Sequence, residues 1–153
     1  MDVILWRHAE AVESLEGTTD LERPLTSRGE KQAARMAAWL NQQLPATTRV
    51  LVSPARRTQQ TAQALERKFR TVPALAPGAS VQAVLEAARW PSAKEPVLVI
   101  GHQPTLGMVA SQLLTGSAQA LAVKKGAVWW LRSREREGEG QVVLVAALTP
   151  EQI

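Results

Sequence analysis

The stretch Val3-Ile4-Leu5-Trp6-Arg7-His8 runs four apolar residues directly into an arginine and a histidine. The sequence has 153 residues and one other histidine, which ends the similar stretch Val97-Leu98-Val99-Ile100-Gly101-His102. Continuous apolar runs of this kind are typical of strands that are buried on both faces of a parallel sheet. Open α/β proteins bind their ligands at the carboxyl ends of such strands. We therefore expect both imidazoles and the Arg7 guanidinium to lie at one edge of a sheet.

The rest of the sequence alternates between strand-like and helix-like segments. The expected strands span residues 3–6, 49–52, 97–100, 127–131 and 142–148, with a further extended segment near 71–75. Residues 132–140 alternate Arg and Glu and contain two glycines, so they are predicted to form a solvated hairpin turn. The alternation predicts a single domain over residues 1–153. Its expected architecture is a three-layer α/β/α sandwich with a mainly parallel central sheet and an antiparallel C-terminal edge.

Capping signals indicate where the helices begin. Ser27, with Glu30 three residues later, has the spacing of a capping box. Ser53, which Pro54 follows, and Ser80 are the expected N-cap residues of the next two helices. Residues at helical spacing mark the faces that these helices and a fourth one bury: Ala33, Ala37, Leu40 and Leu44, then Thr58, Ala62, Leu65 and Phe69, then Val81, Val84, Leu85 and Ala88, then Leu106, Val109, Ala110 and Leu113.

The composition narrows the class of protein. Cysteine is absent, which excludes disulfides, thiolate metal sites and a cysteine nucleophile. The net charge of +4 fits either a solvated surface or the steering of anionic substrates. The basic residues are dispersed and form no cluster with aromatic residues, so we do not expect nucleic acid as a partner. No apolar run approaches the roughly 18 residues of a membrane span, and we expect a cytoplasmic protein that does not bind membranes.

Arg57 adds a second guanidinium to the expected edge of the sheet, because it falls in the first turn of the helix after strand 49–52. The free N–H groups and the dipole of that helix terminus favour an anion. Two guanidinium groups and two imidazoles suit a tetrahedral dianion such as a phosphoryl group. No cluster of carboxylates follows these strands to hold Mg²⁺. The arginines are therefore expected to supply the charge compensation, with no metal or other cofactor.

Three motifs resemble those of the histidine phosphatase superfamily. Leu5-Trp6-Arg7-His8-Ala9 is similar to its Arg-His-Gly signature, with alanine in place of the glycine. Residues 53–62 are similar to the second motif, in which an arginine precedes a threonine by four residues, and Gly101-His102 matches the third. Together with Arg23-Pro24-Leu25-Thr26 and the short chain, these motifs most resemble the small phosphohistidine phosphatases of the SixA type. That resemblance implies a phosphoglycerate-mutase-like fold.

The resemblance also implies a role for each matched residue. His8 would be the nucleophile and would carry the phosphoryl group transiently. Arg7, Arg57 and His102 would hold the phosphoryl oxygens, and Arg23 would join them from the loop at 10–23. A neutral imidazole, whose ordinary pKa is near 6.5, is nucleophilic at neutral pH without a strong base. Phosphoryl transfer through a loose transition state depends on positioning of the reacting groups and on stabilisation of charge more than on covalent chemistry by the protein.

Two assignments in this expected pocket have alternatives. Arg57 is preferred to Arg56 because it stands four residues before Thr61, as the motif requires, and Arg56 is then a surface charge. The loop offers three carboxylates as the acid that protonates the leaving group: Glu10, Asp20 and Glu22. Asp20 is the first of these to test. Two alternatives stay open: Asp20 is a solvated loop carboxylate without a catalytic role, or no acid protonates the leaving group at all.

The expected function is that of a metal-independent phosphohistidine phosphatase. Its substrate would be a phosphohistidine-bearing signalling or phosphotransfer protein. A small-molecule phosphomonoesterase of the same superfamily is the alternative enzyme, and a phospho-dependent binding module without turnover is the alternative from another class. Lys124-Lys125 either form a solvated turn or meet an acidic protein partner. The sequence makes no prediction of the oligomeric state.

Overall fold

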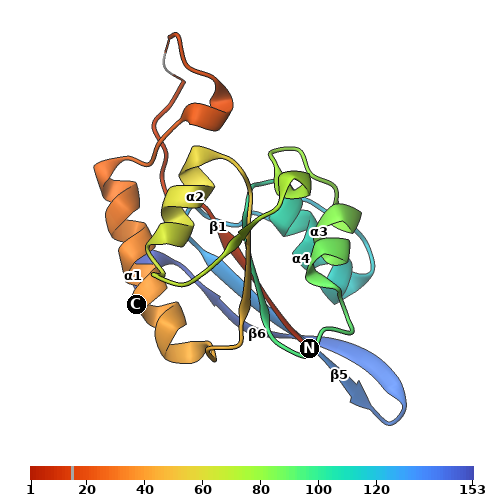
Figure 1. Ribbon diagram of the computed structural model, residues 1–153. Helices are drawn as coiled ribbons and strands as arrows, with labels where there is room; N and C mark the ends of the chain where they lie inside the picture. The colour runs from red at the N-terminus through yellow and green to blue at the C-terminus, as the bar shows by residue number, and fades with distance from the viewer. Residues whose placement is uncertain (15) are drawn as a thin grey trace.

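A six-stranded sheet lies at the centre of the fold (Figure 1). The computed structural model describes residues 1–14 and 16–153; residue 15, within the expected loop at 10–23, lies outside the described residues. The strands are β1 (Asp2–Arg7), β2 (Arg49–Val52), β3 (Arg70–Thr71), β4 (Val97–Gly101), β5 (Val128–Arg136) and β6 (Glu139–Leu148). Across the sheet they follow the order β3-β2-β4-β1-β5-β6. The first four strands are parallel, whereas β5 pairs antiparallel with both β1 and β6, so the predicted sheet is confirmed.

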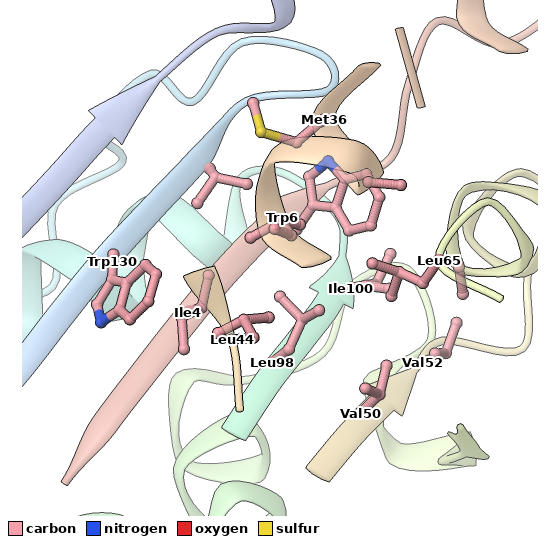
Figure 2. Packing of buried hydrophobic residues seen from close by; sticks show 14 residues of the cluster. Ile4, Trp6, Met36, Leu44, Val50, Val52, Leu65, Leu98, Ile100 and Trp130 are labelled. Atoms are coloured by element: carbon pink, nitrogen blue, oxygen red, sulfur yellow. The ribbon is translucent and has the colours of Figure 1, made fainter. Parts of the chain in front are cut away.

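Helices cover both faces of this sheet. Figure 1 shows α1 (Ser27–Gln43) and α2 (Arg56–Gln63) on one face, and α3 (Val81–Ala88) and α4 (Thr105–Thr115) on the other. Side chains of β1 alternate between the two resulting cores. Ile4 and Trp6 pack beneath α1, as Figure 2 shows, while Val3 and Leu5 pack on the side of α3 and α4. Short 3₁₀ helices lie at Asp20–Glu22, Pro73–Leu75 and Pro150–Gln152.

The start of α1 differs from the sequence prediction by one residue. Thr26 is the N-cap, and its side chain accepts a hydrogen bond from the Gly29 N–H. The predicted capping box of Ser27 and Glu30 is therefore wrong. Serine and threonine both cap helices, and here the backbone of Thr26 is tied to the carbonyl of Glu10, which sets the register. For α3 the prediction is confirmed, because Ser80 accepts from the backbone of that helix.

The segment after α2 is also less regular than predicted. The helix ends at Gln63, so Leu65 and Phe69 lie beyond it, although Leu65 is still buried in the core. The extended segment expected near 71–75 is the two-residue strand β3 followed by a 3₁₀ turn. Pro73 has no N–H to donate to a sheet ladder, which is consistent with the strand ending before it.

The C-terminal hairpin is longer than predicted. Residues 132–140 are not a solvated turn, because β5 and β6 pair from Val128 opposite Leu148 as far as Arg136 opposite Glu139. The turn consists of Glu137 and Gly138, both with positive φ (55° and 80°), as in the tightest hairpin turns. The alternating charges misled the prediction because main-chain pairing at an edge of a sheet does not require apolar side chains.

The strand register places the predicted functional residues at one edge. Arg7 is opposite Gly101 in the β1–β4 pair, and Val52 is opposite Ile100 in the β2–β4 pair. The chain segments that follow β1, β2 and β4 therefore leave the sheet side by side. The buried indole of Trp6 donates a hydrogen bond to the Gly126 carbonyl, 3.1 Å away, which ties β1 to the turn before β5 at the same edge.

Candidate active site

His8 is held rigidly where β1 ends. Its backbone N–H donates to the Gly101 carbonyl and its own carbonyl accepts from Gly126, while the next residue, Ala9, donates to the hydroxyl of Thr61 on α2. The residue is 6% exposed, and Nδ1 lies 2.7 Å from the Ala9 carbonyl oxygen. A carbonyl oxygen only accepts, so Nδ1 carries the proton. In the neutral ring, Nε2 is then unprotonated and has a free lone pair.

His102 faces His8 from the end of β4, with 5.4 Å between the ring centroids. Its Nε2 lies 2.7 Å from Oγ of Ser53, and its Nδ1 lies 3.5 Å from Nη2 of Arg57. A guanidinium only donates, so this Nδ1 is the acceptor and Nε2 carries the proton that is donated to Ser53. Both ring nitrogens thus have partners, and the contact with Arg57 is the longer of the two.

Arg57 lies at the start of α2 with its side chain buried, whereas its neighbour Arg56 is exposed. Nη1 of Arg57 donates to the Asp20 carbonyl at 2.7 Å, and Nη2 donates to the Asp20 carboxylate at 3.1 Å. The same carboxylate pairs with Arg23, whose Nε lies 3.0 Å from Oδ1. Arg23 also donates to the Val12 carbonyl. The loop at 10–23 therefore reaches the site through Asp20 and Arg23.

Arg7 completes the group of cations. It is half-buried, and its Nη1 donates to the Val123 carbonyl at 2.9 Å. Burial, followed by the charge of Arg57, lowers the pKa of its guanidinium, which nevertheless stays charged. Three buried side-chain nitrogens of the described residues have no hydrogen-bond partner: Nε of Arg7 and Nε of Arg57 in the site, and Nη1 of Arg49 at the start of β2. Buried donors without acceptors are uncommon in folded proteins and call for an explanation.

The buried imidazoles are neutral over most of the pH range. Burial lowers the pKa of His8 to about 3, and the charges of His102, Arg57 and Arg7 add to this effect, against the hydrogen bond to Ala9. Burial and the charge of Arg57 likewise lower the pKa of His102 to about 4. Both shifts mean that the site disfavours further positive charge. The same surroundings favour an anion.

The three candidate carboxylates of the loop lie in different surroundings. Glu10 accepts from the Thr26 hydroxyl, and Glu22 accepts from Thr19, so each takes part in local structure near a helix start. Asp20 contacts the site arginines. Partial burial raises the pKa of its carboxyl, but hydrogen bonds to Arg57 and Arg23 outweigh this and hold the pKa below its ordinary value. Asp20 is therefore ionised at neutral pH.

Ser53 is the site residue that sequence reasoning missed. It was expected to cap the following helix, but the N-cap of α2 is Ala55 and Ser53 is fully buried against His102. The prediction was wrong because Pro54 and Ala55 separate Ser53 from the first helical residue, Arg56. A signal was present nonetheless: Ser53 follows β2, and β2 lies directly beside β4, which leads into His102.

Comparison with known proteins agrees with this arrangement. The family described as Histidine phosphatase superfamily (branch 1) matches residues 3–79, which include His8, Arg23 and Arg57. The chain belongs to the histidine phosphatase superfamily. It is therefore a phosphatase with the α/β fold of that superfamily, as the sequence predicts.

The chain is similar to proteins of this superfamily that are named phosphohistidine phosphatases. The chain is 34% identical over 125 residues to phosphohistidine phosphatase SixA of Escherichia coli (strain K12), and the match covers 76% of each chain. It is 31% identical over 129 residues to a phosphohistidine phosphatase SixA homolog of Haemophilus influenzae, covering 74% of this chain and 77% of the other. Among solved structures, the protein histidine phosphatase SixA complexed with tungstate has a TM-score of 0.75 at 27% identity, covering 98% of this chain and 97% of that one.

Residues 1–14 and 16–153 contain no group of three or more His, Cys, Asp or Glu side chains that could hold a metal ion. Over the same residues, no helix combines the length and the apolar composition that crossing a membrane requires.

Proposed function

We propose that this phosphatase removes phosphoryl groups from phosphohistidine in a signalling or phosphotransfer protein, without a metal, through an intermediate phosphorylated on His8. One observation carries the proposal. The His8 ring has its proton fixed on Nδ1 by the Ala9 carbonyl, which leaves Nε2 with a lone pair, and the ring faces His102, which contacts the buried guanidinium of Arg57. A fixed, neutral and desolvated imidazole surrounded by cations is suited to attack a phosphorus atom.

The reaction proceeds in two steps. Nε2 of His8 attacks the phosphorus and the new N–P bond forms, while the N–P bond to the substrate imidazole breaks; that ring carries a proton on its other nitrogen and so leaves as neutral imidazole. Arg7 and Arg57 neutralise the charge on the phosphoryl oxygens, and the two unpartnered Nε–H groups are donors suited to these oxygens if the side chains adjust on binding. Water then attacks the phosphoryl group on His8 and releases inorganic phosphate and the neutral imidazole. Removing one such donor typically lowers the rate by about 10²–10³-fold.

His102 would take a second role once the anion is bound. Its Nδ1 accepts from Arg57 at 3.5 Å. A phosphoryl dianion beside the ring favours protonation of this nitrogen, since a nearby opposite charge stabilises the charged form. The protonated ring then donates from Nδ1 to a phosphoryl oxygen while Nε2 stays bonded to Ser53.

The state of Asp20 favours phosphohistidine over a phosphate ester. An alkoxide leaving group needs a general acid, and Asp20, the loop carboxylate that contacts the site arginines, is ionised at neutral pH. A phosphorylated imidazole has a weaker bond to phosphorus and a better leaving group. The SixA relatives are named for the same substrate.

The test offers the purified protein a histidine-phosphorylated protein, a phosphoserine peptide and a sugar phosphate, all in excess chelator. We expect turnover of the phosphohistidine substrate and an acid-labile phosphoenzyme in rapid-quench samples, both abolished in His8→Ala. Arg56→Ala is the matched control, because Arg56 is exposed beside the buried Arg57. A preference for the sugar phosphate would reject the substrate, loss of turnover in chelator would reject the metal-free route, and an active His8→Ala would reject the nucleophile.

A further inference from the structure

A groove of about 530 Å³ adjoins the site on the side of Arg7. Its charged lining consists of four cations and two carboxylates: Arg7, Arg28, Lys124, Lys125, Glu10 and Glu151. A second hollow of about 190 Å³ shares Arg28 and Glu151 with the groove and continues along α1 past Lys31 and Arg35. The two hollows therefore form one path that leads away from Arg7 along the helix.

Five exposed side chains give this path its charge, and we call them the basic strip: Arg28, Lys31, Arg35, Lys124 and Lys125. The ion pairs found among residues 1–14 and 16–153 join Asp20 to Arg23 and Arg57, and Asp2 to Arg132, so none involves the basic strip. Together with Arg7, the cations along the path number six, against the two carboxylates Glu10 and Glu151. The path therefore has a net positive charge, and within the described part of the chain no cation of the strip forms an ion pair with either carboxylate.

The lysine end of the strip is tied to the nucleophile. Val123, next to Lys124, accepts a hydrogen bond from Arg7, and Gly126, next to Lys125, donates to the His8 carbonyl at 2.9 Å. The two lysines therefore project from a turn whose ends are fixed to the two residues at the end of β1. A molecule that lies on this turn is adjacent to a phosphoryl group bound at His8.

We infer that the basic strip binds an acidic surface of the phosphorylated protein substrate and so orients its phosphohistidine toward His8. This inference rests on the proposed function. A small phosphate ester does not reach along the whole strip. Arg28 and Arg35 are seven residues apart on α1, which is about 10 Å along the helix axis, and of the two only Arg28 lines the groove of Arg7. Complementary charge between surfaces raises the rate of encounter and fixes the register of the complex.

The experiment uses the full chain and two histidine-phosphorylated peptides that differ only in flanking residues, four Asp and Glu in one and four Asn and Gln in the other. Phosphoimidazole is the third substrate, since it cannot reach the strip. At low ionic strength we expect kcat/KM for the acidic peptide to exceed that for the amide peptide by about tenfold or more. Because exposed charges are screened by salt, the ratio is expected to approach one at high ionic strength.

The variant is Lys124→Glu/Lys125→Glu. We expect it to lose the preference for the acidic peptide, with kcat/KM for phosphoimidazole within about twofold of the wild type because the catalytic groups are untouched. Its matched control is Lys68→Glu/Lys94→Glu, which changes the net charge equally. Lys68 and Lys94 are exposed and precede β3 and β4, at the opposite edge of the sheet from the site. A second variant, Arg28→Glu/Arg35→Glu, tests the helix end of the strip.

The outcomes separate this inference from the proposed function. The docking surface is overturned if the wild type has equal kcat/KM for the two peptides, or if the matched control loses the preference for the acidic peptide to the same extent. In either case, turnover of phosphoimidazole leaves the proposed function standing. A loss of phosphoimidazole turnover in Lys124→Glu/Lys125→Glu shows that the lysines act within the catalytic pocket and also overturns it. If the protein turns over neither of the two peptides nor phosphoimidazole, the proposed function is rejected, and the docking surface is rejected with it.

Discussion

Asp20 binds the buried guanidinium of Arg57 twice, through its carbonyl oxygen at 2.7 Å and through its carboxylate at 3.1 Å. An arginine proposed to hold a phosphoryl group is therefore already paired with an anion of the same chain. The carboxylate is largely exposed, so it can leave at small cost, whereas Arg57 is buried and stays. Asp20 thus shields the charge of the unliganded pocket and competes with any oxyanion that binds there.

Asp20→Asn is expected to bind tungstate up to about tenfold more tightly than the wild type, because the substitution removes a negative charge that competes for Arg57 and Arg23. Isothermal titration calorimetry at constant ionic strength measures the affinity. We expect kcat for phosphoimidazole to change by less than about threefold, since an ionised carboxylate does not serve as the general acid. A loss of about 10²-fold or more in kcat would instead identify Asp20 as that acid.

Arg57→Ala is expected to lower kcat/KM for a phosphohistidine substrate by about 10²–10³-fold, because it removes a buried donor that meets the charge developing in the transition state. Arg57→Lys keeps the charge but not the two-pronged guanidinium, so we expect only partial recovery. Arg56→Ala serves as the control and is expected to stay within about twofold of the wild type. Equal effects at positions 56 and 57 would show that the wrong arginine had been assigned.

Ser53→Ala is expected to leave the buried Nε2–H of His102 without an acceptor. Such a lost partner typically costs about 1–3 kcal/mol of folding free energy. Because Ser53 acts by orienting His102, the informative measurement is ¹⁵N NMR of the imidazoles, in which we expect the His102 tautomer to change while that of His8 does not. An unchanged His102 spectrum, with only a loss of stability, would assign Ser53 a packing role.

The two buried histidines make stability depend on pH. Their pKa values are about 3 and about 4 in the folded protein, against 6.5 ordinarily, so below pH 6.5 the unfolded chain binds protons that the folded chain does not. The stability that comes from this difference in proton binding is fully present above pH 6.5. It is lost as the pH falls toward the pKa values of the folded protein. Each histidine adds a slope of about 1.4 kcal/mol per pH unit in that window.

Urea unfolding at pH 7.5, 6.0 and 5.0 measures this slope. We expect the free energy of unfolding to fall steadily below pH 6.5 and His8→Asn to reduce the slope by about half, because one titrating ring is removed. A free energy of unfolding that stays constant between pH 7.5 and pH 5.0 would contradict the burial of the two rings.

Much of this architecture can be read from side-chain patterns along short segments. The boundaries of β2 agree with the predicted strand 49–52, and the apolar run before Gly101 predicts a strand buried on both faces. The parallel arrangement then follows from the alternation of strands and helices, and it places His8 and His102 at one edge. These inferences succeed because the burial of apolar residues is a local property with a regular period.

Other features depend on contacts between distant segments, and no local pattern carries them. Ser53 meets His102 because β2 and β4 are neighbours in the sheet, and Asp20 meets Arg57 across 37 positions of sequence. The long β5–β6 hairpin relies on main-chain hydrogen bonds, which leave little mark on the side chains of residues 132–140. The amino-acid pattern thus specifies which chemical groups reach the edge of the sheet. Their partners, protonation and charge balance follow from the packing, because each depends on which atoms lie within a few ångströms after folding.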